Sequence, residues 1–167
     1  QQVEKTTRVK ARVKAQALKE FMSTKERVVV MGHKITDVDA LGAAIGIYRA
    51  GKTLGKPVHI VVNDPSTSIR LLMAGYMNNP DYEPSMFVNS AQAKELVDNN
   101  TVVVVVDTNK PSYTECQDLL YMTKTVVVLD HHRRGSEVIE NAVLSYVEPY
   151  ASSACEMVAE ILQYFDD

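Results

Sequence analysis

The sequence lacks the features that mark several common protein classes. It has two cysteines, Cys116 and Cys155, which stand in unrelated surroundings without a CxxC spacing, so neither a disulfide framework nor a zinc ribbon is expected. No apolar run approaches the ~20 residues of a membrane span, and no segment has the basic start, apolar centre and cleavage site of a signal peptide. We therefore expect a soluble chain from a reducing, cytoplasmic compartment that makes no membrane contact of its own.

Several ready-made catalytic motifs are also absent. The sequence contains no Walker loop, no GxGxxG, no GxSxG and no HExxH, and it shows no internal repeat or low-complexity stretch. Its 167 residues, 46% of them hydrophobic, can bury one core but leave little for a second domain. Any chemistry must therefore come from a different arrangement of residues within one domain.

Charge is distributed unevenly along the chain. Residues 1–27 hold eight Lys or Arg against three Glu, a balance of +5, whereas residues 28–167 hold ten against eighteen, a balance of -8. Nucleic-acid surfaces need clustered cations to contact phosphates, so the acidic remainder argues against a broad surface of that kind. A small anionic substrate remains compatible with the sequence if metal ions neutralise its site.

The basic lead segment, residues 1–26, has the composition of a helix. Its apolar residues Val9, Val13, Ala17 and Phe21 are spaced four apart, and we expect them to pack as one stripe. We interpret the segment as a connecting helix, with an arm that binds nucleic acid or a membrane surface as the alternative.

The remainder alternates between strand and helix patterns, which predicts an α/β fold. A parallel five-stranded sheet with helices on both faces follows from this order. Gly42 and Gly46 should let the first of these helices approach the sheet closely, and His59 is expected to be structural. Strands are predicted near 27–32, 58–62, 102–107, 125–129 and 143–147, helices near 38–54, 66–77, 90–98, 112–122 and 152–165, and a loop at 78–90.

Three of these strands are valine-rich and run directly into polar residues. The segments are VVVMGHKITDVD, VVVVVDTN and VVVLDHH, and ligands bind at the carboxyl ends of strands in parallel α/β sheets. Carboxylates and imidazoles gathered at one edge repel one another unless cations lie between them. The sequence therefore predicts a metal site formed by His33, Asp37, Asp39, Asp107, Asp130, His131 and His132.

Each of these residues has a simpler explanation when taken alone. His33 could be a surface histidine, Asp37 and Asp39 could cap a helix, and Asp107 or Asp130 could bind a ribose hydroxyl. Their joint occurrence at three strand ends favours the metal site.

The same segments resemble a known family. HKITDVD, the following ALGAA helix, VVVVVDTN and LDHHRR are similar to the first three signature motifs of the DHH phosphoesterases, in order across residues 28–153. Within that family, KTTRVKARVKAQALKEF and ASSACEMV most closely resemble the GdpP-type cyclic di-AMP phosphodiesterases of Gram-positive bacteria. Those are membrane-anchored proteins in which a sensory domain and a degenerate diguanylate-cyclase-like domain precede the DHH domain.

The resemblance implies a Rossmann-like DHH domain with two manganese ions. His33, Asp37 and Asp107 would hold one ion, and Asp39, Asp107 and His131 the other, with Asp107 bridging the two. The activity implied is hydrolysis of cyclic di-AMP to linear pApA by a metal-activated water.

The resemblance also implies roles for three residues beside the ligands. Asp130 would orient a ligand, whereas His132 and Arg133 would reach the phosphoryl oxygens. A nanoRNase or RecJ-like exonuclease, a pyrophosphatase relative, or a non-catalytic nucleotide-binding module remains an alternative.

One departure from the family pattern affects these expectations. The family supplies a further aspartate to the second ion from a GIxxDT-like motif, and the sequence ends at Asp167 before such a motif. We therefore expect residues 27–167 to be a C-terminally truncated DHH domain that lacks its DHH-associated domain and is weak or inactive alone. Its parent chain would be anchored with this domain on the cytoplasmic side, and a homodimer is left open.

Overall fold

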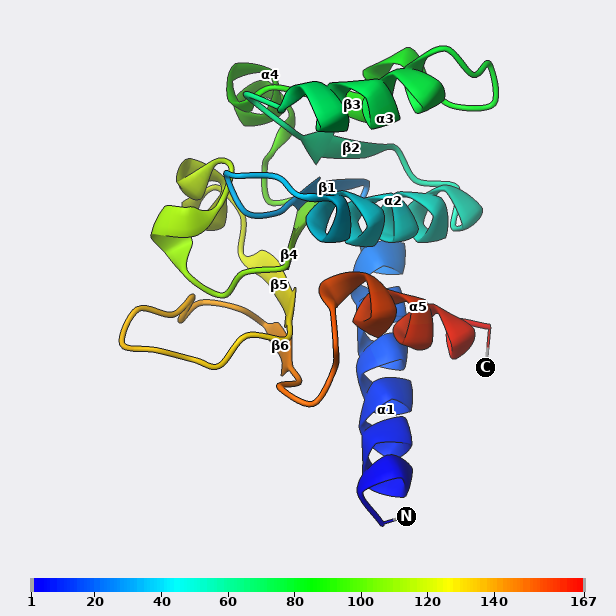
Figure 1. Cartoon of the computed structure of the whole chain (residues 1–167), viewed down its shortest axis with the longest axis vertical. Coiled ribbons are helices and arrows are strands. Elements are labelled where there is room, and N and C mark those ends of the chain that lie inside the picture. Colours follow the sequence, from blue (N-terminus) through cyan, green and yellow to red (C-terminus); the bar gives the residue numbers. More distant parts are fainter. Residues whose placement is uncertain (1, 167) are drawn as a thin grey trace.

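The computed structural model describes residues 2–166, with side-chain surroundings from residue 8 onwards. Figure 1 shows a sheet with long helices along one side and shorter elements on the other. The elements are α1 (Gln2–Thr24), β1 (Arg27–Met31), α2 (Val38–Thr53), β2 (Val58–Val61), α3 (Thr67–Met77), η1 (Pro84–Met86), β3 (Phe87–Val88), α4 (Ser90–Leu96), β4 (Thr101–Val106), η2 (Pro111–Tyr113), η3 (Gln117–Tyr121), β5 (Thr125–Asp130), β6 (Leu144–Val147) and α5 (Ala154–Gln163), where η denotes a 3₁₀ helix.

The sheet has six parallel strands in the order β3-β2-β1-β4-β5-β6. The parallel α/β class is confirmed, but the count of five strands was too low by one. The additional strand, β3, has two residues and pairs only with Ile60 and Val61, so it is too short to produce a sequence pattern within the expected loop. This strand order is that of doubly wound folds, and its direction reverses between β1 and β4, where such folds bind ligands.

Alternating side chains of the central strands form two hydrophobic clusters. Val28 and Val30 of β1 belong to the cluster shared with α1, α2, α3 and α5. Val29 and Met31 belong to the other cluster, which is closed by α4 and η3. Because successive residues of a strand point to opposite faces, the valine runs are buried on both sides, and helices cover both faces as predicted.

The lead segment forms α1, as predicted, but packs through a different stripe. Its fully buried residues are Ala11, Ala15, Leu18 and Met22, whereas Val9 and Val13 of the predicted stripe are 57% and 60% exposed. Ala17 and Phe21 are partly buried beside the core. A strict four-residue spacing winds around a helix that has 3.6 residues per turn, whereas steps of four and three stay on one side.

None of the helices in the described part of the chain has the length and apolar character of a membrane span.

The helix predicted at 112–122 is absent, and that prediction was wrong. The segment contains η2 and η3, with an extended stretch between them. Thr114 forms a β-bridge with His33, and the backbone N–H of Glu115 donates to the carbonyl of Gly32. These bonds hold the stretch against the loop that follows β1, so a long-range pairing overrides the local helical pattern.

Gly42 and Gly46 were expected to let α2 approach the sheet closely, and that prediction was wrong. Both face α5 rather than the sheet, since a Cβ atom at Gly42 would lie 3.0 Å from Cys155 Sγ and one at Gly46 2.8 Å from Val158 Cγ1. The prediction of a structural His59 fits its contacts, because its Nδ1 lies 2.7 Å from the Ser85 carbonyl and it is buried.

Candidate metal centre

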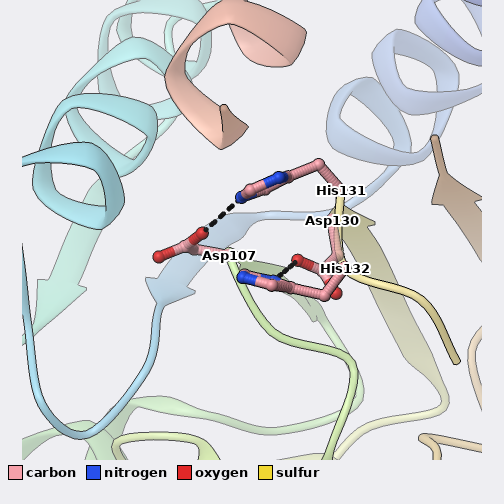
Figure 2. Close-up of side chains that lie close together, drawn as sticks. All are labelled: Asp107, Asp130, His131 and His132. Carbon is pink, nitrogen blue, oxygen red and sulfur yellow. Dashed lines mark hydrogen bonds and ion pairs between the residues drawn. The ribbon is translucent and has the colours of Figure 1, made fainter. Parts of the chain in front are cut away.

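The three predicted strand ends meet at one edge of the sheet. β4 pairs with both β1 and β5, so the loops that follow these three strands are neighbours. One ligand atom from each of Asp107, Asp130, His131 and His132 lies within 4.8 Å of the others. Figure 2 shows these four side chains, with His131 joined to Asp107 and His132 joined to Asp130. The His131–Asp107 contact joins the ends of β5 and β4, so the parallel pairing of these strands brings the cluster together.

Asp107 occupies the centre of the arrangement and has an unusual backbone. Its Oδ1 lies 3.3 Å from His131 Nε2, which is also 3.8 Å from Asp39 Oδ2. Its φ of 64° places it in the left-handed region, which residues other than glycine seldom adopt. Such a conformation costs about 1–3 kcal/mol and is found mainly at functional sites. The three residues expected to hold the second ion therefore lie together.

The charge at Asp107 is disfavoured in the absence of a cation. Burial, followed by the charges of Asp37 and Asp39, raises the pKa of Asp107 to about 7. Carboxylate oxygens and imidazole nitrogens are both common ligands of divalent metal ions. A bound cation would offset this repulsion, so the donor set and the crowding of carboxylates both fit a metal.

Asp37 and Asp39 also serve as helix caps, as the simpler explanation proposed. Asp37 Oδ1 accepts a hydrogen bond from the backbone N–H of Ala40 at 2.8 Å, which caps α2. The two carboxylate oxygens of Asp39 accept from the backbone N–H groups of Ala154 and Cys155 at 3.0 and 2.8 Å. Asp39 thus binds the start of α5 while it remains next to His131, and capping does not separate it from the cluster.

His33 is the predicted ligand whose local bonds fit coordination least. Its Nδ1 accepts a hydrogen bond from the backbone N–H of Ile35 at 3.0 Å, so the proton of a neutral ring lies on Nε2. The ring also packs against Tyr113, with 5.1 Å between centroids. His33 lines the same cavity as Asp107, but coordination of a metal ion through Nε2 would require the other neutral tautomer, with the proton on Nδ1, and would break the hydrogen bond from Ile35.

Asp130 and His132 form a second pair beside the Asp107–His131 pair. His132 Nδ1 lies 2.7 Å from Asp130 Oδ1, and Asn109 Nδ2 donates to Asp130 Oδ2 at 2.7 Å. Asp130 is fully buried, whereas the side chain of His132 is 55% exposed. The arrangement allows Asp130 to orient an imidazole that reaches the open side of the site.

Asn109 was not among the predicted site residues, although it stands in the VVVVVDTN motif two residues after Asp107. Its Nδ2 also donates to the carbonyl of His132 at 3.3 Å, and its buried Oδ1 has no hydrogen-bond partner among the described residues. Buried polar atoms are almost always paired, so this oxygen is a candidate acceptor for a ligand or a water.

Glu115 is a second residue that the sequence reasoning missed. It is buried and accepts hydrogen bonds from Thr36 Oγ1 at 2.8 Å and Asn63 Nδ2 at 3.2 Å. Burial raises the pKa of Glu115, whereas these hydrogen bonds lower it. The contacts join the loops after β1 and β2, and they support the segment that carries the first predicted ligands.

A cavity of about 200 Å³ lies beside Asp107, Asp130 and His132. Arg133, predicted to reach phosphoryl oxygens, is exposed at its edge. The lining consists of His33, Asp107, Thr108, Asn109, Lys110, Tyr113, Asp130, His132 and Arg133. Cationic, aromatic and acidic side chains thus surround a space next to the cluster, as a phosphate ligand beside metal ions would require.

Comparisons with known proteins agree with this geometry. The sequence profile described as "DHH family, N-terminal domain" matches residues 27–167. The chain is 42% identical over 164 residues to "Cyclic-di-AMP phosphodiesterase GdpP" of Bacillus subtilis, and 38% identical over 167 residues to "Cyclic-di-AMP phosphodiesterase PdeA" of Listeria monocytogenes. These alignments cover 97% and 99% of this chain but 25% of each relative, so the chain spans about a quarter of their length.

A solved structure shows the same fold at low sequence identity. An exopolyphosphatase-related protein from Bacteroides fragilis superimposes with a TM-score of 0.72 and 18% identity, over 92% of this chain and 44% of that one.

Proposed function

Because the chain belongs to the DHH family, we propose that it is the metal-binding domain of a phosphodiesterase that hydrolyses cyclic di-AMP to linear pApA. The observation that carries the proposal is the meeting of Asp39, Asp107 and His131 at the carboxyl edge of the sheet. The relatives' names support the substrate, and because this chain spans about a quarter of their length, we propose the complete activity for a longer protein. Anchoring of that protein to a membrane remains part of the proposal.

Two manganese ions are proposed for the site. His33, Asp37 and Asp107 would hold one, and Asp39, Asp107 and His131 the other. Ions there would lower the pKa of a water and offset negative charge on the phosphoryl group. Asp107, next to Asp37, Asp39 and His131, is the residue suited to serve both ions.

The remaining side chains would position the substrate. His132 Nδ1 faces the Asp130 carboxylate, so Nε2 on the opposite edge of the ring is left for the substrate, and an imidazolium would donate from it to a phosphoryl oxygen. Arg133 borders the same cavity and supplies a guanidinium group, which suits the geometry of phosphate oxygens.

A substrate panel tests the proposal. Two proteins would be compared, this chain and a longer protein that covers the full length of its relatives. Each would be given cyclic di-AMP, cyclic di-GMP, short RNA and pyrophosphate while Mn²⁺ is titrated. We expect manganese-dependent conversion of cyclic di-AMP to pApA by the longer version and weak conversion by this chain. Cleavage of RNA or pyrophosphate instead would support the exonuclease or pyrophosphatase alternative. Binding without any turnover would support a nucleotide-binding module.

A further inference from the structure

A second hollow of about 590 Å³ lies beside the candidate metal centre. It is a groove between α1, the segment after β5, and the end of β6. Its lining residues are Lys10, Lys14, Arg133, Arg134, Ser145, Tyr146, Val147, Glu148 and Pro149. We call it the α1–β6 groove. None of the residues predicted to bind metal lines it, so it is a separate feature of the surface.

The groove gathers positive charge in a chain that is acidic outside its lead segment. Two cations come from α1 and two from the segment after β5, against one acid, Glu148, among the described residues that line it. Glu148 is buried and its Oε1 accepts a hydrogen bond from the backbone N–H of Tyr150 at 3.2 Å. The chain's formal net charge is -3, so this accumulation is local.

Ser145 holds cations from both sides of the groove. Lys14 Nζ donates to the Ser145 carbonyl at 3.3 Å, and a guanidinium nitrogen of Arg134 donates to Ser145 Oγ at 2.8 Å. Each contact uses one donor hydrogen, and an ammonium has three while a guanidinium has five. Both side chains are therefore held at Ser145 and retain donors for an anion.

Arg133 connects the groove to the metal centre, because it lines both hollows. A ligand with one phosphate at the metal centre and another in the groove would contact this arginine between them. The cavity over the metal centre, about 200 Å³, is much smaller than the groove, so the bulk of a dinucleotide has more room in the groove.

We propose that the α1–β6 groove binds the phosphodiester group of a dinucleotide that is not being hydrolysed, while the reacting phosphate lies at the metal centre. This inference rests on the proposed function. It assigns Lys10 and Lys14 of the lead helix, together with Arg134, to substrate binding. Guanidinium and ammonium groups that converge on a concave surface are the usual protein ligands of phosphates.

A comparison of two ligands isolates this contact. One is pApA, and the other is the same molecule with a neutral methylphosphonate in place of its internal phosphodiester. Their affinities for this chain would be measured by calorimetry with Mn²⁺ present. The proteins are wild type, Lys10→Ala/Lys14→Ala, Arg134→Ala, and a control, Lys56→Ala/Lys124→Ala, that removes two cations at the opposite edge of the sheet.

We expect wild type and the control to bind the charged ligand about tenfold more tightly, the size of a charge-assisted hydrogen bond. The preference for the charged ligand should vanish in Lys10→Ala/Lys14→Ala and shrink in Arg134→Ala. The second variant changes the segment after β5 rather than α1. Equal affinity of wild type for the two ligands, failure of wild type to bind either, or an unchanged preference in both groove variants would overturn the proposal. Hydrolysis of cyclic di-AMP plays no part in this readout, so the proposed function can fail separately.

Discussion

The buried carboxylate of Asp130 lies 2.7 Å from Nδ1 of the exposed His132 imidazole, and this pair stands beside the Asp107–His131 pair. One pair has an acid fixed by a neighbouring amide, and the other has an acid crowded by other carboxylates. The difference suggests separate tasks. Asp107 is suited to hold cations, whereas Asp130 is suited to orient His132.

Substituting Asp130 by Asn should separate these tasks. An amide has a single acceptor oxygen, so it cannot accept from both Asn109 and His132 as the carboxylate does. We expect kcat of the lengthened enzyme to fall about 10- to 100-fold, the usual effect of losing a residue that orients an active-site ligand. Mn²⁺ affinity, measured by calorimetry, should change much less than in Asp107→Asn. Equal loss of Mn²⁺ binding in both variants would instead make Asp130 a ligand.

The amide of Asn109 should stabilise the fold through its bond to the buried Asp130. Asn109→Ala removes a hydrogen bond to a charged group, for which about 1.5–3 kcal/mol of unfolding free energy is expected. Asn141 offers a comparison at an exposed position, because its Nδ2 donates to the neutral carbonyl of Leu120 at the same 2.7 Å. Asn141→Ala should cost about 1 kcal/mol. Urea unfolding measures both, and a larger loss for Asn141→Ala would refute the interpretation.

Without metal, the chain should become less stable as the pH rises. The pKa of Asp107 is raised from 3.8 to about 7, chiefly by burial, so the folded state binds its proton more tightly than the unfolded state does. Between about pH 4 and pH 7, the unfolded state loses this proton first, and this contribution to the unfolding free energy decreases with pH. Urea unfolding in EDTA at pH 5 and pH 7.5 measures the effect.

Two variants of Asp107 test the assignment of that pH dependence. Asp107→Asn removes the titrating group and should flatten the dependence, whereas Asp118→Asn, at an exposed surface ion pair, should leave it unchanged. Mn²⁺ must displace the same proton, so its affinity should rise with pH below about 7 and level off above. A dependence that persists in Asp107→Asn would assign it to another group.

The contact between α2 and α5 should tolerate no methyl group at Gly46. A Cβ atom there would lie 2.8 Å from Val158 Cγ1, and overpacking of this kind costs about 1–3 kcal/mol. Gly75 of α3 is the control, since a Cβ atom there would meet nothing within 4 Å. Gly75→Ala should stabilise the chain by about 0.5–1 kcal/mol through helix propensity. Thermal unfolding of the two variants should therefore shift in opposite directions, and a parallel shift would contradict the packing.

The sheet and its functional edge could be predicted because their signals are local. Valine runs buried on both faces mark β1, β4 and β5, and the polar residues after them must share an edge once the strands are parallel. Asp107, His131 and Asp39 therefore gather where the sequence predicted.

Features set by distant contacts could not be read in this way. The stretch that contains Thr114 and Glu115 is extended because it bonds to His33 and Gly32 after β1, which lie 81 and 83 residues earlier in the chain. Asn109 has no pattern of its own, and its role appears only when Asp130 is placed beside it. The partners of α1, which are α5 and β6, also lie at the other end of the sequence, so its contacts could not be predicted locally.

The proposed metal centre is tested most directly by manganese-dependent hydrolysis of cyclic di-AMP by the lengthened protein, wild type against Asp107→Ala, with Asp118→Ala as the control. We expect wild type and Asp118→Ala to form pApA only when Mn²⁺ is supplied, and Asp107→Ala to form none while remaining folded. Turnover by Asp107→Ala at the wild-type rate, or turnover by wild type in EDTA, would contradict a metal centre built around Asp107.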